Sequence, residues 1–165
     1  MDKISPCLWF DGNAEEAARL YTSIFPNSRI TSIDRSPGDT PSGPKDMVLT
    51  VNFTIYGRSF IGLNGGPDFK FTEAISLSID CADQAEVDRH WVALLADGGE
   101  ESVCGWLRDK FGVSWQVVPR RLPEMLTSPD REAAARALEA MLKMVKIDVA
   151  GLERAFKGEA VGSAS

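Results

Sequence analysis

Histidine is nearly absent from this 165-residue chain, and cysteine is scarce. The single histidine, His90, leaves no second imidazole for a His-based zinc site and no credible Ser–His–Asp triad. The three cysteines, Cys7, Cys81 and Cys104, are odd in number, and none belongs to a CxxC pair. We therefore expect reduced thiols in a cytoplasmic protein. Because no metal-ligand cluster or cofactor-binding motif stands out, we also expect no cofactor. For Cys104 two roles stay open, a reactive thiol or, more commonly, a buried small hydrophobe.

Long apolar runs and clusters of positive charge are also missing. No run reaches the roughly 18 apolar residues that span a bilayer, so we expect no membrane partner. The formal net charge of −6, without a Lys/Arg run, disfavours binding to a nucleic-acid backbone. Hydrophobic residues make up 44% of the chain, which is enough for a globular core.

A dinucleotide-binding glycine motif is absent as well. The only comparable stretch, "LNGGPDF" at 63–69, follows an expected strand but has no helix behind it. Nucleotide-type cofactor binding is therefore not indicated by any glycine-rich loop.

The first half of the chain contains clear helix and strand patterns. Apolar residues in 17–25 recur with helical spacing, and Asn13 followed by Glu16 predicts a capping box at the start of that helix. The stretch 47–55, "MVLTVNFTI", alternates between apolar and polar residues. This alternation predicts a half-buried antiparallel strand.

The second half repeats this order of elements. A strand at 74–80 precedes a helix with a second expected capping box, Asp83 with Glu86, and "FGVSW" at 111–115 repeats the form of "YGRSF" at 56–60. Although chance similarity is an alternative, the matching helix starts favour an internal repeat. We expect an α+β fold with two tandem βαβββ modules, 3–66 and 73–119, in a curved, mostly antiparallel sheet with helices outside.

A C-terminal helical appendage is expected at 122–157, within a single domain spanning 1–165. Leu138, Met141, Leu142 and Val145 are expected to form the apolar side of its main helix. The sequence leaves open whether the appendage packs on its own chain or on a partner.

The polar faces of the expected strands provide the candidate site. Because successive strand residues point to opposite sides, the faces turned away from the helices form one set. If the modules curl together, this set lines a cavity for a small-molecule ligand, although a simply hydrated face is the alternative. The candidate binding residues are Cys7, Trp9, Asn52, Thr54, Ser76, Ser78 and Gln116.

Several phrases resemble a known family. "FDGNAEEAARLYTSIFPNS", "LNGGPDFKF", "CGWLRDKFGVSWQVVP" and "AMLKMVKIDVAGLERAF" are similar to the PhnB-like proteins, named for a 3-demethylubiquinone-9 3-methyltransferase domain. That family belongs to the vicinal oxygen chelate superfamily, with glyoxalase I, bleomycin-resistance proteins and extradiol dioxygenases. The resemblance implies the glyoxalase/bleomycin-resistance/dioxygenase fold, a homodimer, and a site in the cleft between modules.

The resemblance also implies where the metal ligands of such enzymes would fall. These positions hold Ser5, Ile61, Ala74 and Gln116, of which only Gln116 is a plausible ligand, while Glu73 and Cys7 lie one or two positions away. We therefore expect a metal-independent small-molecule-binding protein resembling PhnB-like and bleomycin-resistance proteins. The alternative is an enzyme of the same family, either a methyltransferase or a metalloenzyme of the glyoxalase or dioxygenase type.

Overall fold

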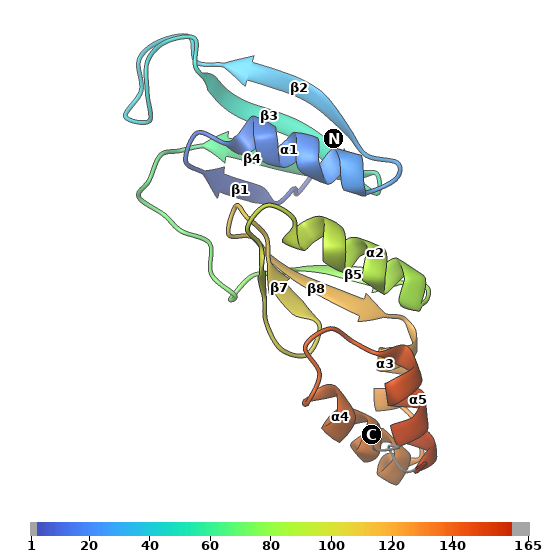
Figure 1. The fold of residues 1–165 in the computed structure, drawn as a ribbon. Coiled ribbons are helices and arrows are strands. Elements are labelled where there is room, and N and C mark those ends of the chain that lie inside the picture. The colour runs from blue at the N-terminus through green and yellow to red at the C-terminus, as the bar shows by residue number, and fades with distance from the viewer. Residues whose placement is uncertain (1–2, 160–165) are drawn as a thin grey trace. The chain divides into compact units, whose positions relative to one another are not determined.

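The structure, a computed structural model, describes residues 3–159 and contains two compact units. They comprise residues Met1–Phe71 and Thr72–Ser165. Each unit contains one βαβββ module, as Figure 1 shows, and the second also carries the C-terminal helices. The predicted α+β class with tandem modules is thereby confirmed.

The first unit is a four-stranded mixed sheet with one helix across it (Figure 1). The strands lie in the order β1-β4-β3-β2, with β1 and β4 parallel and the other neighbours antiparallel. Its elements are β1 Cys7–Phe10, α1 Ala14–Ile24, β2 Arg29–Arg35, β3 Val48–Ile55 and β4 Arg58–Asn64.

Strand β3 has its two faces oriented as the sequence alternation predicts. Val51, Phe53 and Ile55 are buried on the side that α1 covers. Phe53 lies between Phe60, which it stacks on at 5.6 Å between ring centroids, and Tyr21 of α1. The polar residues between them consequently point to the uncovered face of the sheet.

Helix α1 packs on the two central strands, β4 and β3. A Cβ on Gly62 would lie 3.2 Å from the Ala14 Cβ, so glycine here allows the helix to approach the sheet closely. Asn64 accepts a hydrogen bond from the Ala14 N–H at 2.9 Å and donates another to the Val48 carbonyl. The predicted Asn13 cap was wrong, because the Asn13 side chain makes no capping hydrogen bond and the distant Asn64 accepts from the first helical N–H instead.

The second unit repeats this plan with shorter strands. Its sheet has the order β5-β8-β7-β6, and its first and last strands, β5 and β8, are parallel. That the sheets of the two units join into one continuous sheet stays a prediction. The elements of this module are β5 Leu77–Cys81, α2 Gln84–Leu95, β6 Glu100–Glu101, β7 Trp106–Arg108 and β8 Ser114–Pro119.

Helix α2 begins with the capping box that the sequence predicts. Asp83 accepts from the Glu86 N–H at 2.9 Å, and the Glu86 carboxylate accepts from the Ala82 N–H at 2.7 Å. One helical turn further on, His90 is buried with its Nδ1 3.7 Å from the Cys81 sulfur. Burial lowers the pKa of His90, so this residue is a neutral part of the core at pH 7.

The repeated phrases form two different turns. Tyr56 and Gly57 both have positive φ (49° and 78°) and make a two-residue hairpin. In the second unit the turn is longer, and the buried Asp109 carboxylate organises it by accepting from the N–H groups of Phe111 and Val113 and from the indole of Trp115. The stretch "RDKFGVSW" at 108–115 therefore has a structural role, because it forms this turn.

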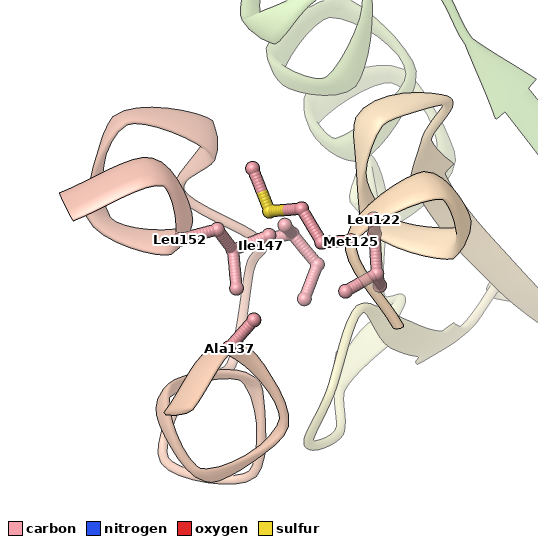
Figure 2. Close-up of a cluster of buried hydrophobic side chains, with 5 residues drawn as sticks. All are labelled: Leu122, Met125, Ala137, Ile147 and Leu152. Carbon is pink, nitrogen blue, oxygen red and sulfur yellow. The ribbon is translucent and has the colours of Figure 1, made fainter. Parts of the chain in front are cut away.

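The C-terminal helices form a small core of their own. They are α3 Arg121–Leu126, α4 Arg131–Met141 and α5 Val149–Lys157. Figure 2 shows how side chains from all three helices and from the α4–α5 connection converge on one cluster. The buried members of that cluster are Leu122, Met125, Ala137, Ile147 and Leu152.

The expected apolar side of α4 was partly wrong. Leu138, Leu142 and Val145 are 42%, 58% and 43% exposed, whereas the alanines of α4, including Ala137, face the cluster. Small residues let α4 and α5 pack closely, which leaves the larger apolar side chains outside.

The C-terminal helices pack on their own chain. The N–H groups of Cys104 and Gly105 donate to the carbonyls of Met144 and Val145, both at 2.8 Å. Gln84 of α2 donates to the Ile147 carbonyl and accepts from the Val149 N–H, so a side chain from α2 satisfies the first turn of α5. These contacts answer the question that the sequence left open about this appendage.

We predict that Asp109→Ala lowers the free energy of unfolding by about 3 kcal/mol, because three donors lose a shared carboxylate acceptor. Denaturant titration followed by tryptophan fluorescence measures this change. Asp68→Ala, on an exposed turn, is the control and should cost well under 1 kcal/mol. Equal stability of the two variants would contradict the role given to Asp109.

Candidate functional site

Strand β2 carries an irregularity that determines what lies on the uncovered face of the first sheet. Ile30 pairs with Phe53, but Ser32, two residues on, pairs with Asn52, so Thr31 is an extra residue in the ladder. Such a β-bulge shifts the alternation of the strand that contains it. Arg29 and Ser32 consequently lie on the same side as the polar residues of β3.

A polar network follows the bulge. The Asn52 amide donates to the Ser32 hydroxyl at 2.9 Å and to the Asp34 carboxylate at 3.0 Å. Ser32 and Thr50 also donate to that carboxylate. The negative charge of Asp34 is thus held by three neighbours on the sheet surface.

Beside this network the first unit has a hollow of about 370 Å³. It lies over strands β2, β3 and β4 and reaches the segment before β1. Its wall combines hydroxyl, amide and guanidinium groups with apolar surface, to which Ile61 contributes a side chain. The lining residues are Ser5, Arg29, Thr31, Asn52, Phe53, Thr54, Gly57, Ser59, Phe60 and Ile61.

Two polar groups in this hollow are not used by the fold. Arg29 is exposed, and its guanidinium makes no hydrogen bond or ion pair with the other residues in 3–159. The Ser5 hydroxyl oxygen is buried and has no hydrogen-bond partner in the same part of the chain. Leaving a buried hydroxyl unsatisfied costs on the order of 1–3 kcal/mol, which a bound ligand can recover.

Of the candidate residues in the first unit, Asn52 and Thr54 line the hollow. Cys7 and Trp9 share their face of the sheet through β1 but lie outside that lining. The Trp9 indole donates to the Gly66 carbonyl at 2.8 Å and meets Phe69 edge-on at 4.9 Å between centroids. Part of the Trp9 ring is therefore covered by residues of its own chain.

The other three candidates lie in the second unit. Gln116 donates to the Ser76 hydroxyl at 2.8 Å, and Ser78 is its register partner on the neighbouring strand. The three therefore share the polar face of the β5–β8 pair. That they complete one cavity with the candidates of the first unit stays a prediction.

Sequence reasoning missed the role of β2. Arg29 and Thr31 of β2 line the hollow, as does Ser59 of β4. A regular alternation through "RITSIDR" would place Arg29 on the opposite face from Ser32 and Asp34, whereas the bulge places Arg29 and Ser32 on one face. Polar residues at both ends of that strand were the available signal, but a bulge cannot be located from one sequence.

The residues at the implied metal positions do not fit a transition-metal ion. Ile61 and Ala74 have no side-chain ligand atom, Ser5 offers a neutral hydroxyl, and only the Gln116 carbonyl oxygen is a plausible ligand. Within residues 3–159, no group of three or more His, Cys, Asp or Glu side chains is placed to hold a metal ion. The same residues contain no helix long and apolar enough to cross a bilayer.

In each unit a helix covers one face of the βαβββ sheet, and the other face carries polar side chains. The protein therefore belongs to the class built from two such modules. The family model described as 3-demethylubiquinone-9 3-methyltransferase matches residues 2–118. The chain belongs to this PhnB-like family. Helices α3 to α5 lie beyond the matched residues.

Solved structures support the assignment. A PhnB protein from Bacillus cereus is 37% identical, with a TM-score of 0.63, and the match covers 70% of this chain and 97% of that one. A protein from Pseudomonas aeruginosa, 23% identical with a TM-score of 0.57, has the same fold, and the match covers 70% and 95% of the two chains. No curated protein matches the sequence.

We predict that thiol reagents distinguish Cys7 from Cys81. Partial burial raises the pKa of Cys7, and burial together with Glu86 and Asp80 raises the pKa of Cys81 to about 12. Because the thiolate is the reactive form, Cys7 should alkylate slowly at pH 7 and faster as the pH rises, whereas Cys81 should stay unmodified in the folded protein. Mass spectrometry after iodoacetamide treatment measures both.

In denaturant the two thiols should react at the same rate, which provides the control. Rapid labelling of Cys81 in the native protein would contradict the burial described here.

Proposed function

We propose that this protein binds a small organic molecule on the polar face of its first sheet, without the help of a metal ion. The observation that carries the proposal is the hollow of about 370 Å³ lined by side-chain hydroxyls, an amide and one guanidinium. Its volume is in the range of small-ligand pockets, and its polar groups converge from three strands and the segment before β1. The residues at the implied metal positions support metal independence, since only Gln116 among the four is a plausible ligand.

The proposal also includes the polar face of the second unit, in line with the superfamily that the sequence resembles. Ser76, Ser78 and Gln116 supply a second polar face that would complete the ligand site, as in the paired modules of bleomycin-resistance proteins. In this proposal the whole chain acts as a single domain, with module bounds 3–66 and 73–119 and the appendage 122–157. The three free cysteines agree with a reducing, cytoplasmic location.

The methyltransferase description of the family receives less support from the residues. The only glycine-rich phrase has a structural explanation, because a Cβ on Gly65 would lie 2.2 Å from the Trp9 ring. Gly65 therefore makes room for Trp9. The pairs β1–β4 and β5–β8 are parallel, but all other neighbouring strands are antiparallel. Neither sheet is therefore the doubly wound parallel sheet whose switch point binds nucleotide cofactors.

We predict that a thermal-shift screen of small organic molecules finds ligands that stabilise the protein in the presence of a chelator. A ligand at 100 times its dissociation constant adds about 2.7 kcal/mol to the free energy of unfolding, which is a clear shift. Thr54→Val, which removes a hydroxyl from the hollow while keeping its shape, should weaken the best ligand, and Asn52→Leu should do so more strongly.

Thr22→Val, the same change on α1, is the matched control and should leave binding unchanged. Ligands that stabilise only after addition of a divalent metal, or that ignore both pocket variants, would contradict the proposal.

We also propose a homodimer, and predict that sedimentation at micromolar concentration gives twice the 18.0 kDa chain mass. The exposed side chains of Leu138 and Leu142, four residues apart at the end of α4, support this, because a partner could cover them. Leu142→Glu should shift the mass toward that of a monomer, whereas Val92→Glu, an exposed position on α2, should not. A native protein that sediments as a monomer would overturn the proposal.

A further inference from the structure

The charge distribution in the hollow of the first unit indicates which class of ligand it accepts. Arg29 is the single charged residue in the lining, and no carboxylate belongs to it. Asp34, on the same face, is not in the lining, and its carboxylate accepts hydrogen bonds from Ser32, Thr50 and Asn52. The hollow is therefore locally positive in a chain whose formal net charge is −6.

The position of Arg29 is fixed by its backbone. Its N–H donates to the Thr54 hydroxyl at 3.2 Å, and its register partner across the ladder is Thr54. The bulge at Thr31 follows directly, and the Thr31 hydroxyl donates to the Asn52 carbonyl at 3.0 Å. These contacts hold the start of β2 against β3 while leaving the guanidinium uncommitted.

Resting on the proposed function, we propose that the hollow binds the carboxylate of a small organic acid, with Arg29 as its charged contact. A guanidinium can hold a carboxylate through two parallel N–H···O bonds, and these charge-assisted bonds are about twice as strong as neutral ones. The buried Ser5 hydroxyl supplies a further donor, and Ile61 supplies an apolar surface for the remainder of the molecule. Arg29 is thus a specificity-determining residue for an anion.

The test compares benzoate, benzamide and benzylamine, three probes of similar shape that differ in charge. Isothermal titration of the full chain at low ionic strength should show benzoate binding at least about tenfold more tightly than benzamide, with benzylamine the weakest. Arg29→Gln should abolish this preference, and Arg29→Lys should restore part of it. Arg58→Gln, an exposed arginine outside the lining, is the matched control and should behave like the native protein.

Competition between inorganic phosphate and benzoate that disappears in Arg29→Gln would also support an oxyanion subsite. Equal binding of benzoate and benzamide, unaffected by Arg29→Gln, would overturn the anion assignment and leave small-molecule binding intact. Failure of all three aromatic probes and of phosphate to bind would likewise overturn it, whereas the proposed binding function is decided separately by the library screen with the Thr54 variant.

Discussion

The packing of α1 on β4 is the constraint on which the first unit depends. Strand β4 lies between β1 and β3, and Gly62 brings the helix close to its centre. Asn64, at the end of the same strand, ties down the start of α1. Because successive strand residues point to opposite faces, the residues on β1, β3 and β4 that do not face α1 are directed to the other face, where the hollow forms.

The second unit uses the same plan but stabilises it by different means. Its strands are shorter, and the two-residue turn of the first unit is replaced by a loop organised around Asp109. The C-terminal helices then attach through backbone hydrogen bonds at Cys104 and Gly105 and through the Gln84 side chain. In the second unit the buried Asp109 organises a turn, whereas in the first unit the Arg29 guanidinium and the Ser5 hydroxyl make no hydrogen bond within residues 3–159.

Much of this fold could be predicted because its strongest signals are local. The alternation in β3 correctly placed Asn52 and Thr54 on the uncovered face, and the capping box of α2 was read directly from Asp83 and Glu86. Long-range features could not be read in this way. The cap on α1 comes from Asn64, fifty residues away along the chain, and the exposed Leu142 follows from a helix that packs through its alanines.

The site shows the same division between local and long-range information. A regular strand fixes the side on which each residue lies, but one extra residue reverses that assignment for everything after it. The bulge at Thr31 therefore hid the association of Arg29 with Asn52. Trp9 was placed on the correct face, yet its contact with Phe69 depends on a loop whose path no periodicity describes.

The central claim is that the polar face of the first sheet is the ligand site. Amide chemical-shift mapping by NMR, with the full chain and the strongest ligand from the library screen, tests it most directly. We expect the largest chemical-shift changes at the amides of Thr31, Asn52, Thr54 and Ser59, and no change at the amides of α4 and α5. Chemical-shift changes confined to the C-terminal helices, with no change at the residues lining the hollow at saturating ligand, would contradict this claim.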